Sequence, residues 1–86
     1  MTLDELKEKY VVILLREPMS HMGKSITSVT GTFGGGTLPG FFVLNQVQNA
    51  YDEAGTDIAS EVDLVGKAIM GRSENIQSIV TGAGPS

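Results

Sequence analysis

The sequence has no cysteine and no tryptophan, and His21 is its single histidine. No disulfide can form, and a structural metal site built from cysteine and histidine is excluded. Aromatic residues are scarce as well, at 6% of the 86 residues. A chain of this length buries only about 60–65% of the surface that its unfolded form exposes. Stability must therefore come from a well-packed core or from association with other subunits.

Basic residues are also few. Six Lys and Arg stand against ten Asp and Glu, which gives a net charge of −4. A protein that binds nucleic acid needs a basic face to neutralise phosphates, so we expect no nucleic-acid partner. The hydrophobic content of 41% is ordinary for a folded protein and argues against wholesale disorder.

Long apolar runs are absent. The longest covers residues 10–15, far short of the roughly 20 residues needed to span a bilayer. Residues 1–6 include Asp4 and Glu5 and lack the pattern of a secretory signal peptide. We therefore expect no signal peptide and no transmembrane helix, and a location in a virion or in the cytoplasm.

The apolar pattern predicts a mostly α fold in a single domain over residues 1–86, with three to four short helices. An N-terminal helix is expected over residues 1–17, because Thr2 can cap it and Pro18 is a natural stop. Residues 10–15 are apolar without interruption, so they fit either a buried helix end or a short buried strand. The helix-start signal at Thr2 favours the helix. The helical spacing is carried by Leu3, Leu6, Tyr10 and Ile13.

The remainder divides by composition. Residues 18–40 are mostly small and polar and are expected to form a long Gly/Ser/Thr-rich loop or arm. Residues 41–82 are predicted to be helical and residues 83–86 to form a tail, with Gly55, Gly71 and Gly82 ending successive helices. Apolar residues at helical spacing support this interpretation: Phe41, Leu44, Val47 and Tyr51, then Ile58, Val62, Val65 and Ile69.

Gly23-Lys24-Ser25 matches the end of a phosphate-binding P-loop, which also requires a glycine five residues before Gly23. That position holds Pro18, and the residues between are bulky. We therefore interpret the segment as a solvated turn rather than a nucleotide site. No Asp is placed locally to orient the imidazole of His21, so we interpret that residue as a surface histidine.

Acidic residues cluster between positions 52 and 63, but their spacing does not match an EF-hand loop. A calcium site needs several oxygens that converge from one loop. Helix-start charges and solvated faces explain the cluster, so we expect no metal, and we likewise expect no cofactor and no catalytic residue. The cluster consists of Asp52, Glu53, Asp57, Glu61 and Asp63.

Residues 31–42 combine five glycines with all three phenylalanines. Three interpretations fit: a membrane-inserting segment, a loop over the chain's own core, or a conformable arm that docks on a neighbouring subunit. The arm is preferred, and on a helix Phe42 would point at the partner while Phe41 would share a face with the helix's own core. The predicted partner-binding residues are Phe33, Leu38, Phe41 and Phe42.

These patterns favour a small non-enzymatic structural component of a larger protein assembly, such as a virion or a secretion or contractile particle. Its expected partners are protein subunits, identical or different, that order the chain by contact. One alternative is a membrane-active protein that uses residues 31–42, with a membrane as the less favoured partner. The other is a small acidic inhibitor or regulator of a basic protein.

Overall fold

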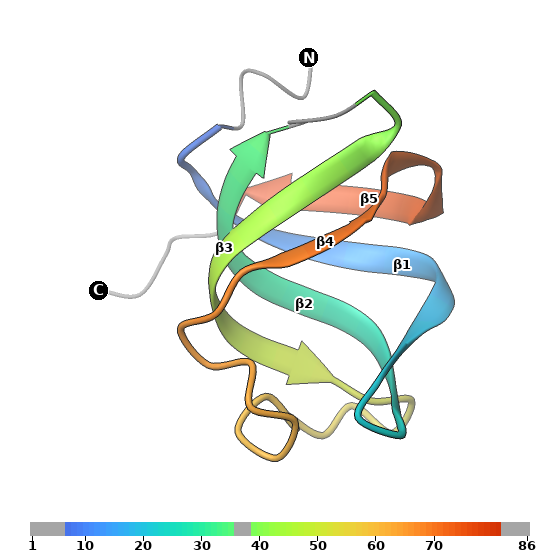
Figure 1. Ribbon diagram of the computed structural model, residues 1–86. Coiled ribbons are helices and arrows are strands. Elements are labelled where there is room, and N and C mark those ends of the chain that lie inside the picture. Colours follow the sequence, from blue (N-terminus) through green and yellow to red (C-terminus); the bar gives the residue numbers. More distant parts are fainter. Residues whose placement is uncertain (1–6, 36–38, 82–86) are drawn as a thin grey trace.

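The computed structural model describes residues 7–35 and 39–81, which form one five-stranded antiparallel sheet in the order β4-β3-β2-β1-β5 (Figure 1). Consecutive strands are neighbours from β1 to β4, and β5 then returns to the far side of β1. The elements are β1 (Tyr10–His21), β2 (Lys24–Gly35), β3 (Phe41–Tyr51), β4 (Ile69–Arg72), the 3-10 helix η2 (Ser73–Asn75) and β5 (Ile76–Thr81).

The predicted mostly α fold is wrong, because the described residues contain no α-helix. The expected helix over residues 1–17 is replaced by β1, and residues 1–6 lie outside the described part. Val11, Ile13 and Leu15 are buried on one face, whereas Leu14 between them is exposed. That period of two is the period of a strand, so the strand interpretation of residues 10–15 is correct.

The predicted loop or arm over residues 18–40 is also wrong for most of its length. Its first residues complete β1, and Lys24–Gly35 form β2, the central strand of the sheet. β-Branched residues explain the strand, because they fit a pleated surface. Gly31 is required by close packing: a Cβ there would lie 2.8 Å from the carbonyl oxygen of Asn45 on β3.

The helical region predicted over residues 41–82 consists instead of β3, β4, η2 and β5, with an irregular connection between β3 and β4. In that connection Ile58 and Val62 turn inward and are buried. Gly71 lies within β4 and does not end a helix. The glycine predicted to end the last helix, Gly82, lies outside the described residues.

A large bulge in β1 interrupts its pairing with β2. Leu14 pairs with Ser28 and Met19 pairs with Ile26, so β1 advances five residues while β2 advances two. Pro18 lies inside this bulge, where its missing N–H interrupts no ladder. Pro18, expected to end a helix, therefore lies in a bulge of a strand that continues past it.

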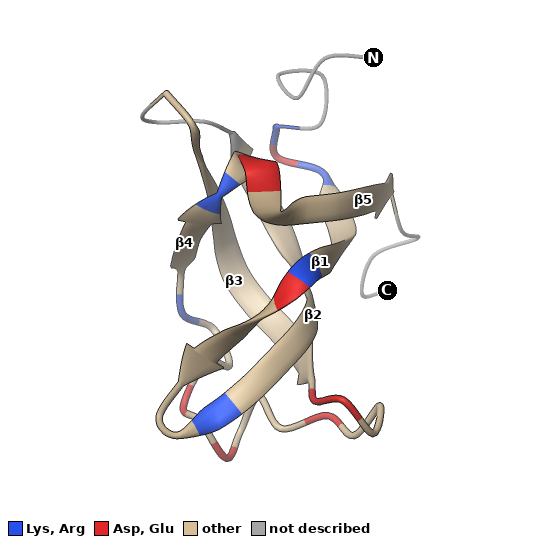
Figure 2. Ribbon diagram, turned by 90° about the vertical axis from the view of Figure 1, so that its right-hand side faces the viewer, with Lys and Arg blue, Asp and Glu red and all other residues tan. Residues whose placement is uncertain are grey.

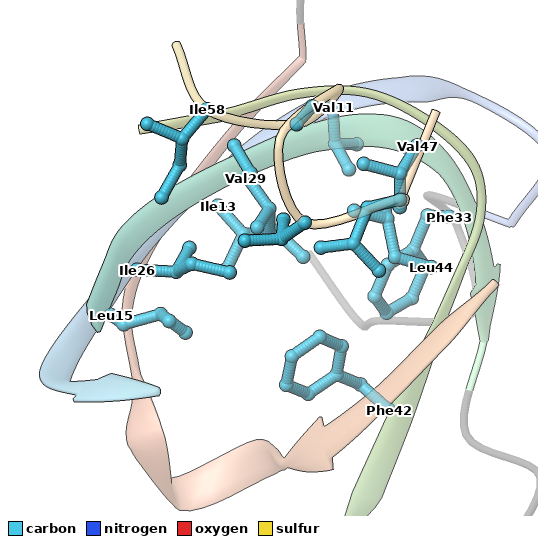
Figure 3. Close-up of a cluster of buried hydrophobic side chains, with 14 residues drawn as sticks. Val11, Ile13, Leu15, Ile26, Val29, Phe33, Phe42, Leu44, Val47 and Ile58 are labelled. Atoms are coloured by element: carbon cyan, nitrogen blue, oxygen red, sulfur yellow. The ribbon is translucent and has the colours of Figure 1, made fainter. Parts of the chain in front are cut away.

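The core lies on the inner side of the curved sheet, where side chains from β1, β2 and β3 converge (Figure 3). Phe33 and Phe42 are its largest members and neither is exposed to solvent. Ile58 and its neighbours in the β3–β4 connection close one end. The cluster consists of Val11, Ile13, Leu15, Ile26, Val29, Phe33, Phe42, Leu44, Val47, Ala50, Ile58, Ala59, Val62 and Leu64.

Across residues 7–35 and 39–81, no helix has the length and apolar character required to cross a membrane.

Candidate functional site

The two outer strands of the sheet, β4 and β5, each have one unpaired side within the described residues. On β4 the pairing pattern identifies the free groups. Ser73 N donates to Gly40 O at 2.9 Å and Val47 N donates to Lys67 O at 2.9 Å, so alternate residues from 67 to 73 face β3. The alternation of an antiparallel ladder then directs the backbone N–H and C=O of Met70 and Arg72 outward.

The same argument applies to β5. Phe33 N donates to Lys9 O at 2.9 Å, so the ladder alternation makes Val11 and Ile13 face β2. Val12 and Leu14 therefore face β5, where they pair with Val80 and Ser78. The backbone groups of the alternate β5 residues, Ile79 and Thr81, are directed away from β1.

Exposed apolar side chains accompany both edges. Met70 on β4 is 51% exposed, and Phe41 lies on the adjacent strand. Val80 on β5 is 55% exposed and pairs with Val12 on β1, two residues from the exposed Leu14. Each edge thus combines unpaired backbone groups with apolar surface, a combination that marks a template for strand addition.

Charge is nearly absent from the two edge strands (Figure 2). β5 has no charged residue, and β4 has only Arg72. Arg72 Nη1 lies 3.1 Å from Glu74 Oε1 on η2, which offsets its charge locally. Two copies of this acidic chain can therefore bring these edges together without opposing like charges.

A groove of about 600 Å³ opens between the β1 bulge, β4 and η2. Met19 and Phe42 contribute apolar lining, and Arg16 and Glu74 lie on its rim. Asn75 holds η2 to the bulge through two hydrogen bonds with the backbone of Glu17. The groove therefore borders the β4 edge.

The predicted partner-binding residues do not form one surface. Phe33 and Phe42 are fully buried in the chain's own core, whereas Phe41 is 36% exposed. Leu38 lies outside the described residues. The helical argument that turned Phe42 outward and Phe41 inward is wrong, because adjacent residues of a strand face opposite sides. Partner binding remains a prediction, and among the described residues of the set Phe41 is the one whose side chain is exposed.

The segment Gly23-Lys24-Ser25, which matches the end of a P-loop, lies at the hairpin that joins β1 and β2. Met22 and Gly23 form the turn, and His21 and Lys24 pair as the last residues of the hairpin. The φ of Gly23 is +75°, a value that favours glycine. Of the segment Gly23-Lys24-Ser25, interpreted as a turn, Gly23 lies in the turn, whereas Lys24 and Ser25 are the first residues of β2.

The acidic cluster contains two carboxylates that accept hydrogen bonds from backbone N–H groups of their own loop or of β3. Asp52 Oδ1 accepts hydrogen bonds from Ala54 N and Thr56 N, both at 2.9 Å. Asp57 accepts from Ala50 N and Ala59 N. In the part of the chain that the structure describes, no three His, Asp or Glu side chains are grouped so as to hold a metal ion.

The pKa of Asp57 reflects these contacts. Partial desolvation raises the pKa, but hydrogen bonds from Ala59 N, from the Asn49 side chain and from Ala50 N together outweigh it. The pKa of Asp57 therefore lies below its ordinary value of 3.8. This carboxylate is a structural acceptor that ties the loop to β3.

The edge residues Met70, Ile79, Val80 and Thr81 are absent from the sequence-based predictions. The run Ile76–Thr81 carries no strand signal, because its apolar residues Ile76, Ile79 and Val80 stand at i, i+3 and i+4, the spacing of a helix. Gly71 and Gly82, on either side of this run, also fit the ends of helices.

No protein-family model, no curated protein and no solved structure matches the chain.

Proposed function

We propose that the chain is a non-enzymatic structural subunit whose copies join through the free edges of β4 and β5. The observation that supports this most directly is that the sheet ends in two unlike edges, each with outward backbone groups beside exposed apolar side chains. The β4 edge of one copy would continue the sheet into the β5 edge of the next. Each junction would add inter-strand hydrogen bonds and cover Met70 and Val80.

Joining unlike edges is a heterologous contact. Every added copy leaves one free β4 edge and one free β5 edge, so growth continues until a ring closes or a filament forms. Joining like edges would instead give a closed dimer. The low charge of both strands lets identical copies of a chain with net charge −4 approach through these edges, in either kind of contact.

The geometry gives less support to the two alternatives. The membrane hypothesis depended on the phenylalanines of residues 31–42, and two of them, Phe33 and Phe42, are buried in the core. The inhibitor hypothesis rests on the acidic net charge of −4, but two of the carboxylates, those of Asp52 and Asp57, already accept hydrogen bonds from backbone N–H groups of their own loop.

The test measures the mass of the native species by light scattering and native mass spectrometry. Met70→Lys and Val80→Lys should each convert the assembly into smaller species, because each places a charge at one edge. Met22→Lys is the control for Met70, and Val65→Lys is the control for Val80. Met22 is 66% exposed in the β1–β2 turn, and Val65 is 55% exposed in the β3–β4 connection.

Mixing separates the two kinds of contact. Met70→Lys keeps an intact β5 edge and Val80→Lys keeps an intact β4 edge, so an equimolar mixture should form heterodimers and nothing larger. If only one of the two substitutions disrupts association, the contact joins like edges. A wild-type chain that stays monomeric at high concentration, or controls as disruptive as the edge variants, would contradict the proposal.

A further inference from the structure

The short connection between β4 and β5 is fastened at both ends to different strands. At one end Ser73 N donates to Gly40 O, beside the start of β3. At the other end the side chain of Asn75 binds the backbone of Glu17 on β1. Two anchors only two residues apart therefore add to the β3–β4 and β1–β5 ladders in holding the two free edges relative to each other.

The Asn75 contact resembles a pair of strand hydrogen bonds. Glu17 N donates to Asn75 Oδ1 at 2.9 Å, and Asn75 Nδ2 donates to Glu17 O at 3.0 Å. Glu17 lies in the β1 bulge, where β1 has departed from its regular pairing with β2. The amide thus continues the β1–β5 ladder beyond its last pair, Leu15 and Ile76, which follows a register shift after Leu14.

The chemistry of this contact is specific to asparagine. Its short side chain presents one acceptor and one donor in a plane, which matches the N–H and C=O of a single residue. An aspartate accepts from Glu17 N but cannot donate to Glu17 O when ionised. The neighbouring Arg72–Glu74 ion pair is exposed on both side chains and contributes little to holding the connection.

We propose that Asn75 is a positioning residue that fixes the angle between the free edges of β4 and β5. The consequence of that angle rests on the proposed function: in head-to-tail assembly it decides whether the copies close into a ring and how many copies the ring contains. A rigid connection gives one stoichiometry, and a loosened connection gives several.

The angle is measured on the isolated chain with two spin labels. The sequence has no cysteine, so Met70→Cys and Val80→Cys give two unique attachment sites, one on each edge. Bulky labels at both edges keep the chain monomeric, so the measurement does not depend on assembly. Double electron–electron resonance should show one narrow distance distribution between the labels.

Asn75→Ala added to the labelled chain should broaden this distribution and shift its mean, while circular dichroism remains that of the folded sheet. Asn75→Asp keeps one of the two hydrogen bonds, so the width of its distance distribution should lie between those of the unsubstituted chain and Asn75→Ala. Gln48→Ala, which truncates an exposed amide on β3, is the matched control and should leave the distribution unchanged. An unchanged distribution in folded Asn75→Ala or Asn75→Asp would overturn the proposal.

Native mass spectrometry of the unlabelled chain then tests the consequence. Asn75→Ala leaves both edges intact, so it should still assemble, but as several stoichiometries in place of one. A single unaltered stoichiometry in Asn75→Ala would show that the angle between the β4 and β5 edges does not determine how many copies close a ring. A monomeric wild-type chain would overturn the proposed function, while the spin-label result would still decide the role of Asn75.

Discussion

Gly71 on β4 lies directly against the ring of Phe42 on β3, its partner in the antiparallel ladder. A Cβ at Gly71 would come within 2.6 Å of Cε2 and 2.8 Å of Cζ of that ring, closer than real Cβ contacts allow. Gly71 is therefore required by the packing of β4 over Phe42. Position 71, where β4 packs on the ring of Phe42, has no space for a side chain.

Gly71→Ala should destabilise the fold by about 1–3 kcal/mol, because the added methyl group displaces a fully buried ring. Urea unfolding in the Val80→Lys background measures this without a contribution from assembly. Phe42→Leu removes the clashing ring atoms, so the double variant should lose less than the sum of the two single variants. Strict additivity would show that the two residues do not compete for space.

Phe42→Ala should destabilise the same background by about 3–5 kcal/mol, the range for removing a buried phenylalanine. Phe41→Ala should change stability by less than about 1 kcal/mol, because that side chain is 36% exposed. Its effect should appear instead as weaker assembly of the otherwise wild-type chain. Equal losses of stability in the two variants would be inconsistent with the observed faces of β3.

Acid should weaken the fold partly through Asp57. Its folded pKa lies below 3.8, so its stabilising contribution is complete above that ordinary value and is lost as the pH falls through the folded pKa. Asp57→Asn should therefore make the loss of stability below pH 3.8 shallower in acid titrations followed by circular dichroism. Glu53→Gln, in the same loop, is the matched control, and an equal effect there would contradict the assignment.

The turn after β3 depends on Asp52. Asp52→Ala removes the acceptor for Ala54 N and Thr56 N and should destabilise the fold by about 0.5–2 kcal/mol. Asp52→Asn keeps an oxygen acceptor in the same place and should retain most of that stability. If the asparagine variant is as unstable as the alanine variant, the negative charge, and not the hydrogen bonds, holds the turn.

The apolar residues of β3 are spaced as in a helix, although the segment is a strand. Its buried residues are Phe42, Leu44, Val47 and Ala50, at spacings of two, three and three. A strand without irregularities would keep a spacing of two throughout. The φ of Gln46 is +49°, and near it the β2–β3 register shifts, so the irregularity moves the later residues to new faces. A bulged strand therefore resembles a helix in its apolar spacing.

The composition of β2 is that of a loop, although it is the central strand. Its threonines and serines suggested a loop, yet Ser28 and Thr30 are buried between two neighbouring strands. Thr30 Oγ1 lies within hydrogen-bond distance of both Asn49 N and Asn49 Oδ1, which satisfies its hydroxyl across the sheet. Small residues suit a central strand whose neighbours approach closely. That environment exists only after β1 and β3 are in place.

The sequence by itself determined the absence of disulfides, the acidic net charge and the positions of sharp turns, because these depend on composition or on local backbone geometry. Gly23, in the segment interpreted as a turn, adopts a φ of +75°, and Gly55, predicted to end a helix, adopts a φ of +81° in the turn after β3. The tertiary structure decided which segments are strands, which of Phe41 and Phe42 is buried, and which strands remain at the edges. Those outcomes depend on hydrogen bonds between distant segments, such as the contact between Glu17 and Asn75, 58 residues apart. No local pattern encodes a partner at that distance.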